Sequence, residues 1–122
     1  MFQVQVEKTI ACAHQLVGYN GPCENLHGHN YRIVVQYKGE GLDECGMLVD
    51  FGDIKARFNE VLAPLDHAFL NELPQFAGIS PSAENLARHV YKEMAVTDFE
   101  RAKLDEVQVW ETPTQMASYR AR

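Results

Sequence analysis

The spacing of hydrophobic residues changes twice along this chain of 122 residues, and that change constrains the fold more than any other feature. Residues 2–12 and 29–38 alternate between apolar and polar side chains, as in a β-strand with one buried face. The spacing then lengthens to that of a helix, and it returns to alternation from Val107 to Glu111. This order predicts an α+β protein with an antiparallel sheet.

Two helices are predicted in the middle of the chain. Asp50 or Asp53 can cap the first, and Ser80-Pro81 would open the second with proline at its first helical position. We also expect a short strand over 47–51. The apolar helix positions are Ile54, Phe58, Val61 and Leu62 in the first helix, and Ala83, Leu86, Ala87, Val90, Tyr91 and Met94 in the second.

The predicted order of elements is strand, strand, helix, helix, strand, strand, within a single domain of residues 1–122. The last strand, over 116–120, would follow a turn at 112–115 and pair back on the strand before it. The two outer strands of such a sheet have edges that carry no proline, so we expect sheets of several chains to join edge to edge.

Composition and charge exclude several classes of protein. A net charge of −6 disfavours nucleic acid as a partner, because phosphate binding needs a basic surface. No run approaches the roughly 18 apolar residues of a membrane helix. The N-terminus lacks a signal-peptide pattern, and the three cysteines suit free thiols in a reducing compartment. We therefore expect a cytoplasmic protein.

Three histidines lie where the first predicted strand ends and the second begins. His27 and His29 are two residues apart, so their side chains share one face of an extended chain. His14 can add a third imidazole if the two strands pair. Three protein ligands and an open position are typical of a catalytic zinc site, whereas a thiolate from Cys12 or Cys23 would close a structural one.

Two further groups could move protons. Cys23 lies in a Gly-Pro-Cys-Glu loop next to the predicted metal, which would lower the pKa of its thiol and make it a base or nucleophile. Asp66 precedes His67 and can orient its imidazole, although such a pair taken alone is more often a surface turn. Cys12 and Cys45 are interpreted as small buried hydrophobes.

Glu111 shares a strand face with Val107 and Val109, which should point inward. A carboxylate on an apolar face needs a partner. That partner could be a ligand with two parallel N–H donors, or it could be Arg120 in the following segment.

Taken together, these motifs resemble the 6-pyruvoyltetrahydropterin synthase superfamily. The match consists of Ala-His at 13–14, Cys-x-x-x-His-Gly-His-Asn-Tyr at 23–31, Pro-Leu-Asp-His at 64–67, Ser-Ala-Glu-Asn at 82–85 and Trp-Glu-Thr at 110–112. It runs through nearly the whole chain in the family's order. The three-residue gap between Cys23 and His27 is similar to that of the bacterial 6-carboxy-5,6,7,8-tetrahydropterin synthase branch, since the animal pyruvoyl-forming enzymes have a longer gap.

The resemblance implies a tunnelling fold (T-fold): a four-stranded antiparallel sheet with two helices on one side, assembled into an oligomeric barrel. The assembly would usually be a homohexamer with its sites between subunits. The implied residue roles are zinc binding by His14, His27 and His29, general-base catalysis by Cys23, proton relay by Asp66 with His67, and pterin anchoring by Glu111 with help from the backbone near Ser82 and Ala83.

The implied reaction converts 7,8-dihydroneopterin triphosphate to 6-carboxy-5,6,7,8-tetrahydropterin, with release of triphosphate and acetaldehyde, in queuosine biosynthesis. Some branches of the superfamily use a glutamate of the cysteine loop as the base, a role that Glu24 could take here. The alternatives are the pyruvoyl-forming reaction, a zinc hydrolase with no use for Glu111, and a non-catalytic zinc-stabilised assembly module.

Overall fold

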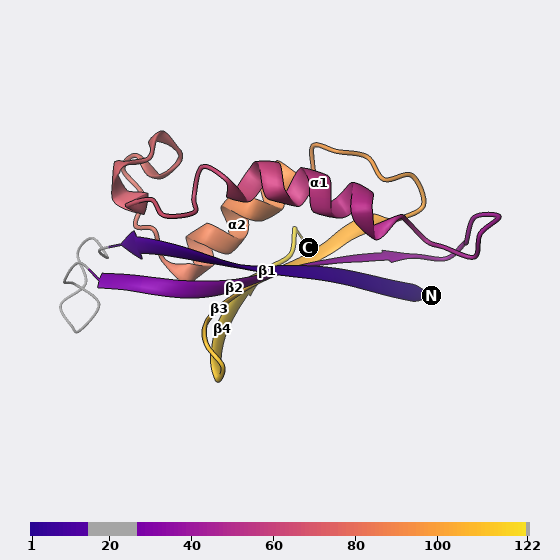
Figure 1. Ribbon diagram of the computed structural model, residues 1–122, viewed down its shortest axis with the longest axis horizontal. Coiled ribbons are helices and arrows are strands. Elements are labelled where there is room, and N and C mark those ends of the chain that lie inside the picture. The colour runs from indigo at the N-terminus through magenta and orange to yellow at the C-terminus, as the bar shows by residue number, and fades with distance from the viewer. Residues whose placement is uncertain (15–26, 122) are drawn as a thin grey trace.

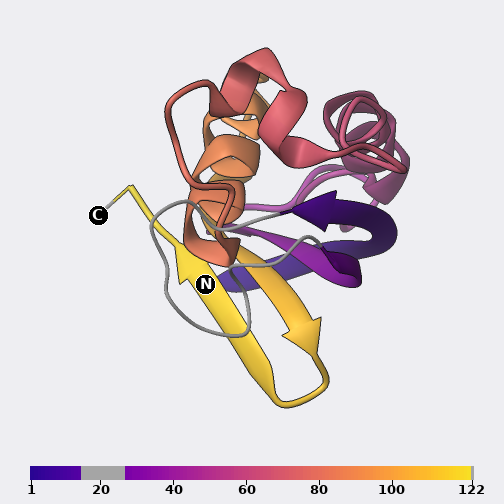
Figure 2. The ribbon, with the colours of Figure 1, turned by 90° about the vertical axis from the view of Figure 1, so that its left-hand side faces the viewer.

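The computed structural model describes residues 1–14 and 27–121, in which four antiparallel strands form one sheet (Figure 1). The strands lie side by side in chain order, from β1 to β4. In Figure 2, α1 and α2 both lie on the same side of this sheet. The elements are β1 (Phe2–His14), β2 (His27–Gly39), α1 (Phe51–Leu62), the short 3-10 helices η2 (Leu70–Glu72) and η3 (Pro74–Phe76), α2 (Ala83–Met94), β3 (Lys103–Thr112) and β4 (Gln115–Tyr119).

The core fills the space between the sheet and the two helices. The apolar residues that the sequence pattern assigns to buried faces form most of it. On the face of β2 that is turned toward the helices, every second residue is at most 1% exposed. These residues are Tyr31, Ile33, Val35 and Tyr37. All four predicted apolar positions of α1 are buried, and so are those of α2 except the partly buried Tyr91. Burial of this apolar surface is the main favourable term in folding. The predicted order of elements is thus confirmed.

The expected strand over 47–51 does not form. Asp43 organises a turn there instead, because its carboxylate accepts the backbone N–H groups of Cys45 and Met47, each at 2.9 Å. Leu48 is buried in the core, and Asp50 then caps α1 by accepting from Gly52 N at 2.8 Å. The apolar side chain of Leu48 therefore packs into the core, although this segment does not pair as a strand.

The start of α2 is two residues later than predicted. Ser82 is the N-cap, with its hydroxyl accepting from Asn85 N at 3.1 Å, and the Asn85 side chain donates to Ser80 O at 2.8 Å. Pro81 therefore precedes the cap and is not the first helical residue. A serine that can accept an N–H of the first turn is a stronger helix start than the preceding Ser-Pro pair.

A segment from the loop after α1 covers the outer edge of β1 near its C-terminal end. Ala13 N donates to Ala68 O at 2.9 Å, His67 N donates to Ala11 O, and Phe69 forms a parallel bridge with Ala13. The expectation of two open edges is therefore wrong for this part of β1, since its backbone groups are already paired. The segment also brings residues 66–69 to the end of the sheet that carries the histidines.

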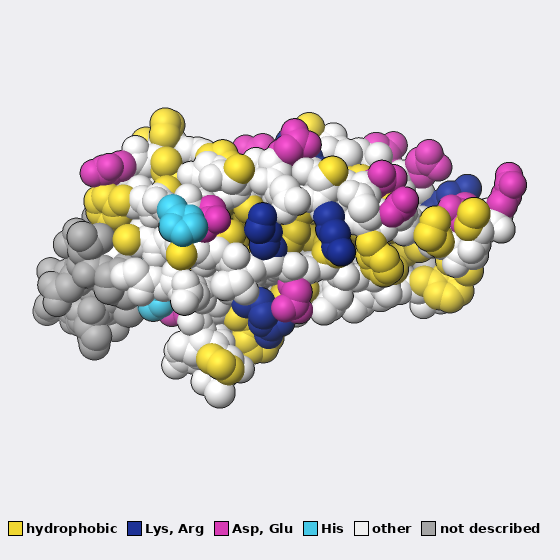
Figure 3. Space-filling model, viewed as in Figure 1, with side chains coloured by type: hydrophobic (Ala, Val, Ile, Leu, Met, Phe, Trp, Pro, Cys, Tyr) yellow, Lys and Arg dark blue, Asp and Glu magenta, His cyan; other side chains and the backbone are white. Residues whose placement is uncertain are grey.

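The surface seen in Figure 3 mixes acidic and basic side chains over the middle of the molecule, while hydrophobic ones gather at the end that carries the N-terminus. Phe2, Leu42, Met47 and Phe51 are exposed large hydrophobic residues. Within the described ranges, no helix is long and apolar enough to cross a membrane.

Candidate metal and substrate site

Strand pairing brings the predicted metal ligands to one end of the sheet. In the antiparallel register, His14 lies directly opposite His27, and Cys12 lies opposite His29. Directly opposite residues are close neighbours on the same face of a sheet. The side chain of His27 lies outside the described part of the chain, so the geometry below concerns His14 and His29.

The two described imidazoles lie against each other. The rings of His14 and His29 are stacked, with centroids 5.0 Å apart and an angle of 14° between their planes. The ring of Tyr31 stacks on His14 at 5.9 Å and meets His29 at 5.2 Å with a tilt of 33°. The Tyr31 hydroxyl lies 2.5 Å from Nδ1 of His14, and both side chains are at least 99% buried, with exposures of 0% and 1%.

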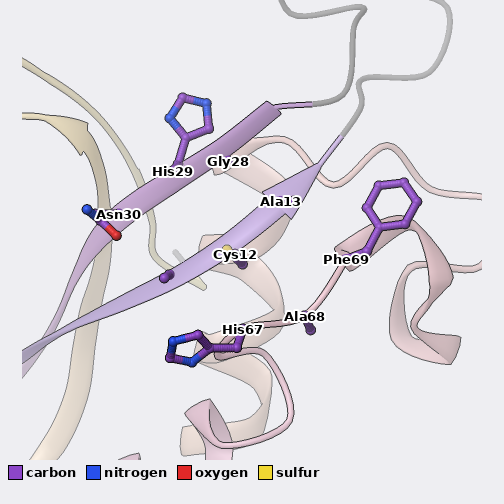
Figure 4. A pocket seen from close by; sticks show the side chains of 9 residues that line it. Cys12, Ala13, Gly28, His29, Asn30, His67, Ala68 and Phe69 are labelled. Atoms are coloured by element: carbon purple, nitrogen blue, oxygen red, sulfur yellow. The ribbon is translucent and has the colours of Figure 1, made fainter.

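An open groove of about 550 Å³ lies beside this end of β1 (Figure 4). It is lined by Ala11, Cys12, Ala13, Gly28, His29, Asn30, His67, Ala68 and Phe69. In Figure 4 the His29 and His67 side chains project to opposite sides of the strand pair. His67 therefore points away from His29 of its own chain (Figure 4).

Asp66 contacts His67, as the sequence predicts, and also holds the loop on β1. Its Oδ1 lies 3.1 Å from Nδ1 of His67 and accepts the Ala11 N–H at 3.0 Å. His67 has a positive φ of 59°, which is uncommon for a residue with a side chain. Its side chain is 81% exposed, so the imidazole can meet a group outside its own chain.

The cysteines have different surroundings. Burial, followed by the nearby Asp66 carboxylate, raises the pKa of the Cys12 thiol to about 12, because both disfavour the thiolate. Cys12 is thus a buried neutral group, as predicted. Cys45 is exposed in the turn after β2, so its interpretation as a buried hydrophobe is wrong. Cys23 and Glu24 lie outside the described residues.

The predicted pterin-binding residues Glu111 and Ala83 line one cavity of about 240 Å³ between the start of α2 and the β3–β4 hairpin. Glu84, Gln115, Met116 and Ala117 complete its lining. Ser82 is the neighbour of Ala83, and its hydroxyl is the helix cap described above. A carboxylate and the first turn of a helix therefore face the same space.

Arg120 is not the partner of Glu111. Its guanidinium lies 3.4 Å from Glu106 and 3.6 Å from Asp105. Among the described residues, no ion pair of Glu111 is found, and its side chain is half-buried. The structure thus removes the specific alternative partner that the sequence left open.

Two features of this end of the sheet were not predicted. One is the hydrogen bond between the Tyr31 hydroxyl and Nδ1 of His14. The other is Arg32, whose guanidinium lies 4.6 Å above the ring of Trp110 and 3.2 Å from the Glu7 carboxylate. Arg32 and Glu111 both line a neighbouring cavity. The only sequence signal for the first is that Tyr31 follows His29 by two residues and so shares its face.

The four-stranded antiparallel sheet with two helices on one face defines a T-fold protein. Residues 3–122 match the protein-family model described as 6-pyruvoyl tetrahydropterin synthase. A 6-carboxy-5,6,7,8-tetrahydropterin synthase of Haemophilus influenzae is 31% identical over 98% of this chain and 99% of its own. The chain therefore belongs to the 6-pyruvoyl tetrahydropterin synthase family, whose members are lyases.

Other relatives carry the second activity of the family in their names. A 6-pyruvoyl tetrahydrobiopterin synthase of Dictyostelium discoideum is 35% identical over 82% of this chain and 74% of its own. Among solved structures, a 6-pyruvoyl tetrahydropterin synthase of Caenorhabditis elegans has a TM-score of 0.87 and 25% identity, covering 99% of this chain and 96% of that one. The chain thus resembles both the carboxy-forming and the pyruvoyl-forming enzymes.

Proposed function

We propose that this protein converts 7,8-dihydroneopterin triphosphate to 6-carboxy-5,6,7,8-tetrahydropterin, releasing triphosphate and acetaldehyde, as a step of queuosine biosynthesis. The observation that carries the proposal is the end-to-end match to a 6-carboxy-5,6,7,8-tetrahydropterin synthase, over 98% of this chain. The three-residue gap between Cys23 and His27 supports the same branch.

The proposed site uses one zinc ion held by His14, His27 and His29. The donor set fits: two buried or half-buried imidazoles stack at 5.0 Å, and the third histidine lies opposite His14 in the strand register. When bound, zinc would polarise a hydroxyl or carbonyl oxygen of the substrate. Elemental analysis of His27→Ala and His29→Ala tests this assignment, because each variant should lose the metal. Full zinc retention in both would overturn it.

The residues of the chain supply the proton transfers in this proposal. Cys23 removes a proton from the carbon next to a side-chain hydroxyl, and His67, held by Asp66, returns one to the pterin. The triphosphate leaves with its bonding electron pair in an elimination. Water then adds to the side-chain carbonyl carbon attached to the ring. Cleavage of the bond between this carbon and the next leaves the carboxyl product, and the departing carbon takes up a proton so that acetaldehyde is released.

Glu111 would anchor the pterin in the cavity that it shares with Ala83. Its carboxylate can accept two parallel N–H bonds from the guanidine-like edge of the ring. Ala83 lines the same cavity and Ser82 precedes it, so the backbone near these residues could also contact the ring.

The orientation of His67 supports a site built from two chains. His67 is 81% exposed and projects away from His29 of its own chain (Figure 4). In a symmetric assembly, an exposed residue of one chain can complete the site of its neighbour. We therefore propose a homo-oligomer, a hexamer in the family's usual form, in which Asp66 and His67 serve the zinc site of an adjacent chain.

Incubation of the zinc-loaded protein with 7,8-dihydroneopterin triphosphate, followed by mass spectrometry of the pterin and an assay for acetaldehyde, tests the function. The carboxy product with acetaldehyde is expected. A pyruvoyl product without acetaldehyde would favour the runner-up activity, which the 35% identity to the Dictyostelium enzyme supports. An unchanged substrate would overturn both and favour a zinc-stabilised assembly module.

A further inference from the structure

Tyr31 is in direct contact with the proposed metal ligand His14. Its hydroxyl lies 2.5 Å from Nδ1 of His14, and its ring lies 5.9 Å from that imidazole and 5.2 Å from that of His29. Tyr31 comes from β2 and His14 from β1, so the contact crosses between two strands. Neither the proposed chemistry nor the proposed pterin contacts use this residue.

We propose that Tyr31 is a positioning residue that fixes the orientation and tautomer of His14, so that Nε2 is the atom presented to the metal. This inference rests on the zinc site of the proposed function and deepens it. A metal-bound histidine commonly donates its other ring N–H to an acceptor, which fixes the ring and raises its basicity as a ligand. With Nε2 on zinc, Nδ1 carries the proton and donates it to the Tyr31 oxygen.

Burial makes the contact between Tyr31 and His14 important. Tyr31 is 0% exposed and His14 is 1% exposed, so bulk water cannot take the place of the hydroxyl. A buried polar group that loses its partner keeps the full cost of its desolvation. Removing the hydroxyl oxygen would therefore leave Nδ1 of His14 without that acceptor, and the Nδ1-protonated tautomer would lose its advantage.

The chain contains a matched control for this substitution. Tyr37 lies six residues further along β2, on the same face, and is 1% exposed. Its ring packs edge-on against Phe99 at 5.4 Å. Within the described part of the chain, its hydroxyl has no hydrogen-bond partner. Tyr37→Phe thus removes the same atom from an equally buried tyrosine that is away from the histidines.

The experiment measures zinc affinity by chelator competition for the wild type, Tyr31→Phe and Tyr37→Phe, with thermal melting of each apoprotein. Loss of such a supporting contact typically weakens metal binding about 10–100-fold. We expect a weakening of that size in Tyr31→Phe and wild-type affinity in Tyr37→Phe. The d–d absorption bands of the cobalt-substituted protein should also shift in Tyr31→Phe alone, which a general loss of stability would not produce.

Equal zinc affinity and equal cobalt spectra in the two variants would overturn the role of Tyr31 and leave the zinc site standing. A wild type that binds no zinc would overturn the site itself. If Tyr31→Phe does not fold, nitrogen-15 NMR of the zinc-loaded wild type gives the answer directly. Protonated Nδ1 with metal on Nε2 of His14 is expected, and the reverse tautomer would contradict the inference.

Discussion

One carboxylate oxygen of Asp66 lies 3.1 Å from Nδ1 of His67 and also accepts the backbone N–H of Ala11 on β1. Asp66 therefore joins an exposed imidazole to the edge of the sheet. The two contacts can be separated by substitution, because an amide oxygen can still accept from Ala11 whereas an alanine cannot. Comparing the two substitutions therefore tests the proton relay and also measures how much the hydrogen bond to Ala11 contributes to stability.

Asp66→Asn should keep the fold and the zinc content but reduce turnover, because a neutral amide orients and stabilises a protonated imidazole poorly. General acid–base catalysis contributes typically about 10²–10⁴-fold, which bounds the expected loss. Asp66→Ala should in addition lower the free energy of unfolding by about 1 kcal/mol through the lost hydrogen bond to Ala11. Steady-state kinetics and denaturant melts measure the two effects. Wild-type turnover in Asp66→Asn would contradict the relay.

A site shared between chains predicts complementation between two inactive variants. His67→Ala lacks the relay and His29→Ala lacks the metal, so each alone should be inactive. When the two are co-expressed and assemble at random, about a quarter of the sites combine an intact metal centre with an intact neighbouring His67. Activity should then return to about that fraction. A mixture that stays inactive, in oligomers verified to contain both variants, would contradict the shared site.

Cys23→Ala should keep zinc and lose turnover by about 10²–10⁴-fold, as expected for removal of a general base. Metal analysis together with kinetics distinguishes the possible roles. Loss of zinc instead would identify Cys23 as a fourth ligand in a closed structural site. Retained turnover would identify Glu24 as the base, and Glu24→Gln should then be the damaging change.

The alternation of residues 31–37 predicted the buried face of β2 correctly, because side-chain direction in a strand follows directly from the sequence. The contact between Tyr31 and His14 could not be predicted in the same way. It depends on the register between β1 and β2, and a shift of register changes which residues lie opposite each other while the alternating pattern of each strand stays the same. The sequence thus indicates which residues share a face, and the pairing decides which of them touch.

The wrong predictions concern a strand over 47–51, a buried Cys45 and an open edge of β1. They also depend on contacts that the sequence pattern does not reveal. The run Met47-Leu48-Val49 is too short for its period to distinguish strand from loop. The hydrogen bonds of Asp43 decide the outcome there, and they also leave Cys45 exposed in the turn. The covered edge of β1 was missed because segment 66–69 pairs through its backbone, which leaves no pattern in the side chains.

Glu111→Gln should weaken pterin binding on the order of 10²-fold while fold and zinc content stay intact. A carboxylate accepts two parallel N–H bonds, whereas the amide end of glutamine presents a donor to one of those donors. Each hydrogen bond to a charged group contributes about 1.5–3 kcal/mol, which sets the expected size. Titration of a pterin into the zinc-loaded protein measures the change.

Glu84→Gln is the matched control, because Glu84 lines the same cavity but is exposed at the start of α2. Its pterin affinity should stay near that of the wild type, since the proposal gives it no contact with the ring. Arg120→Ala should lower thermal stability without changing pterin affinity, because Arg120 pairs with Asp105 and Glu106. Wild-type pterin affinity in Glu111→Gln would remove the residue that argues most specifically for a pterin. A zinc hydrolase, which needs no anchor at this position, would then explain the remaining site better.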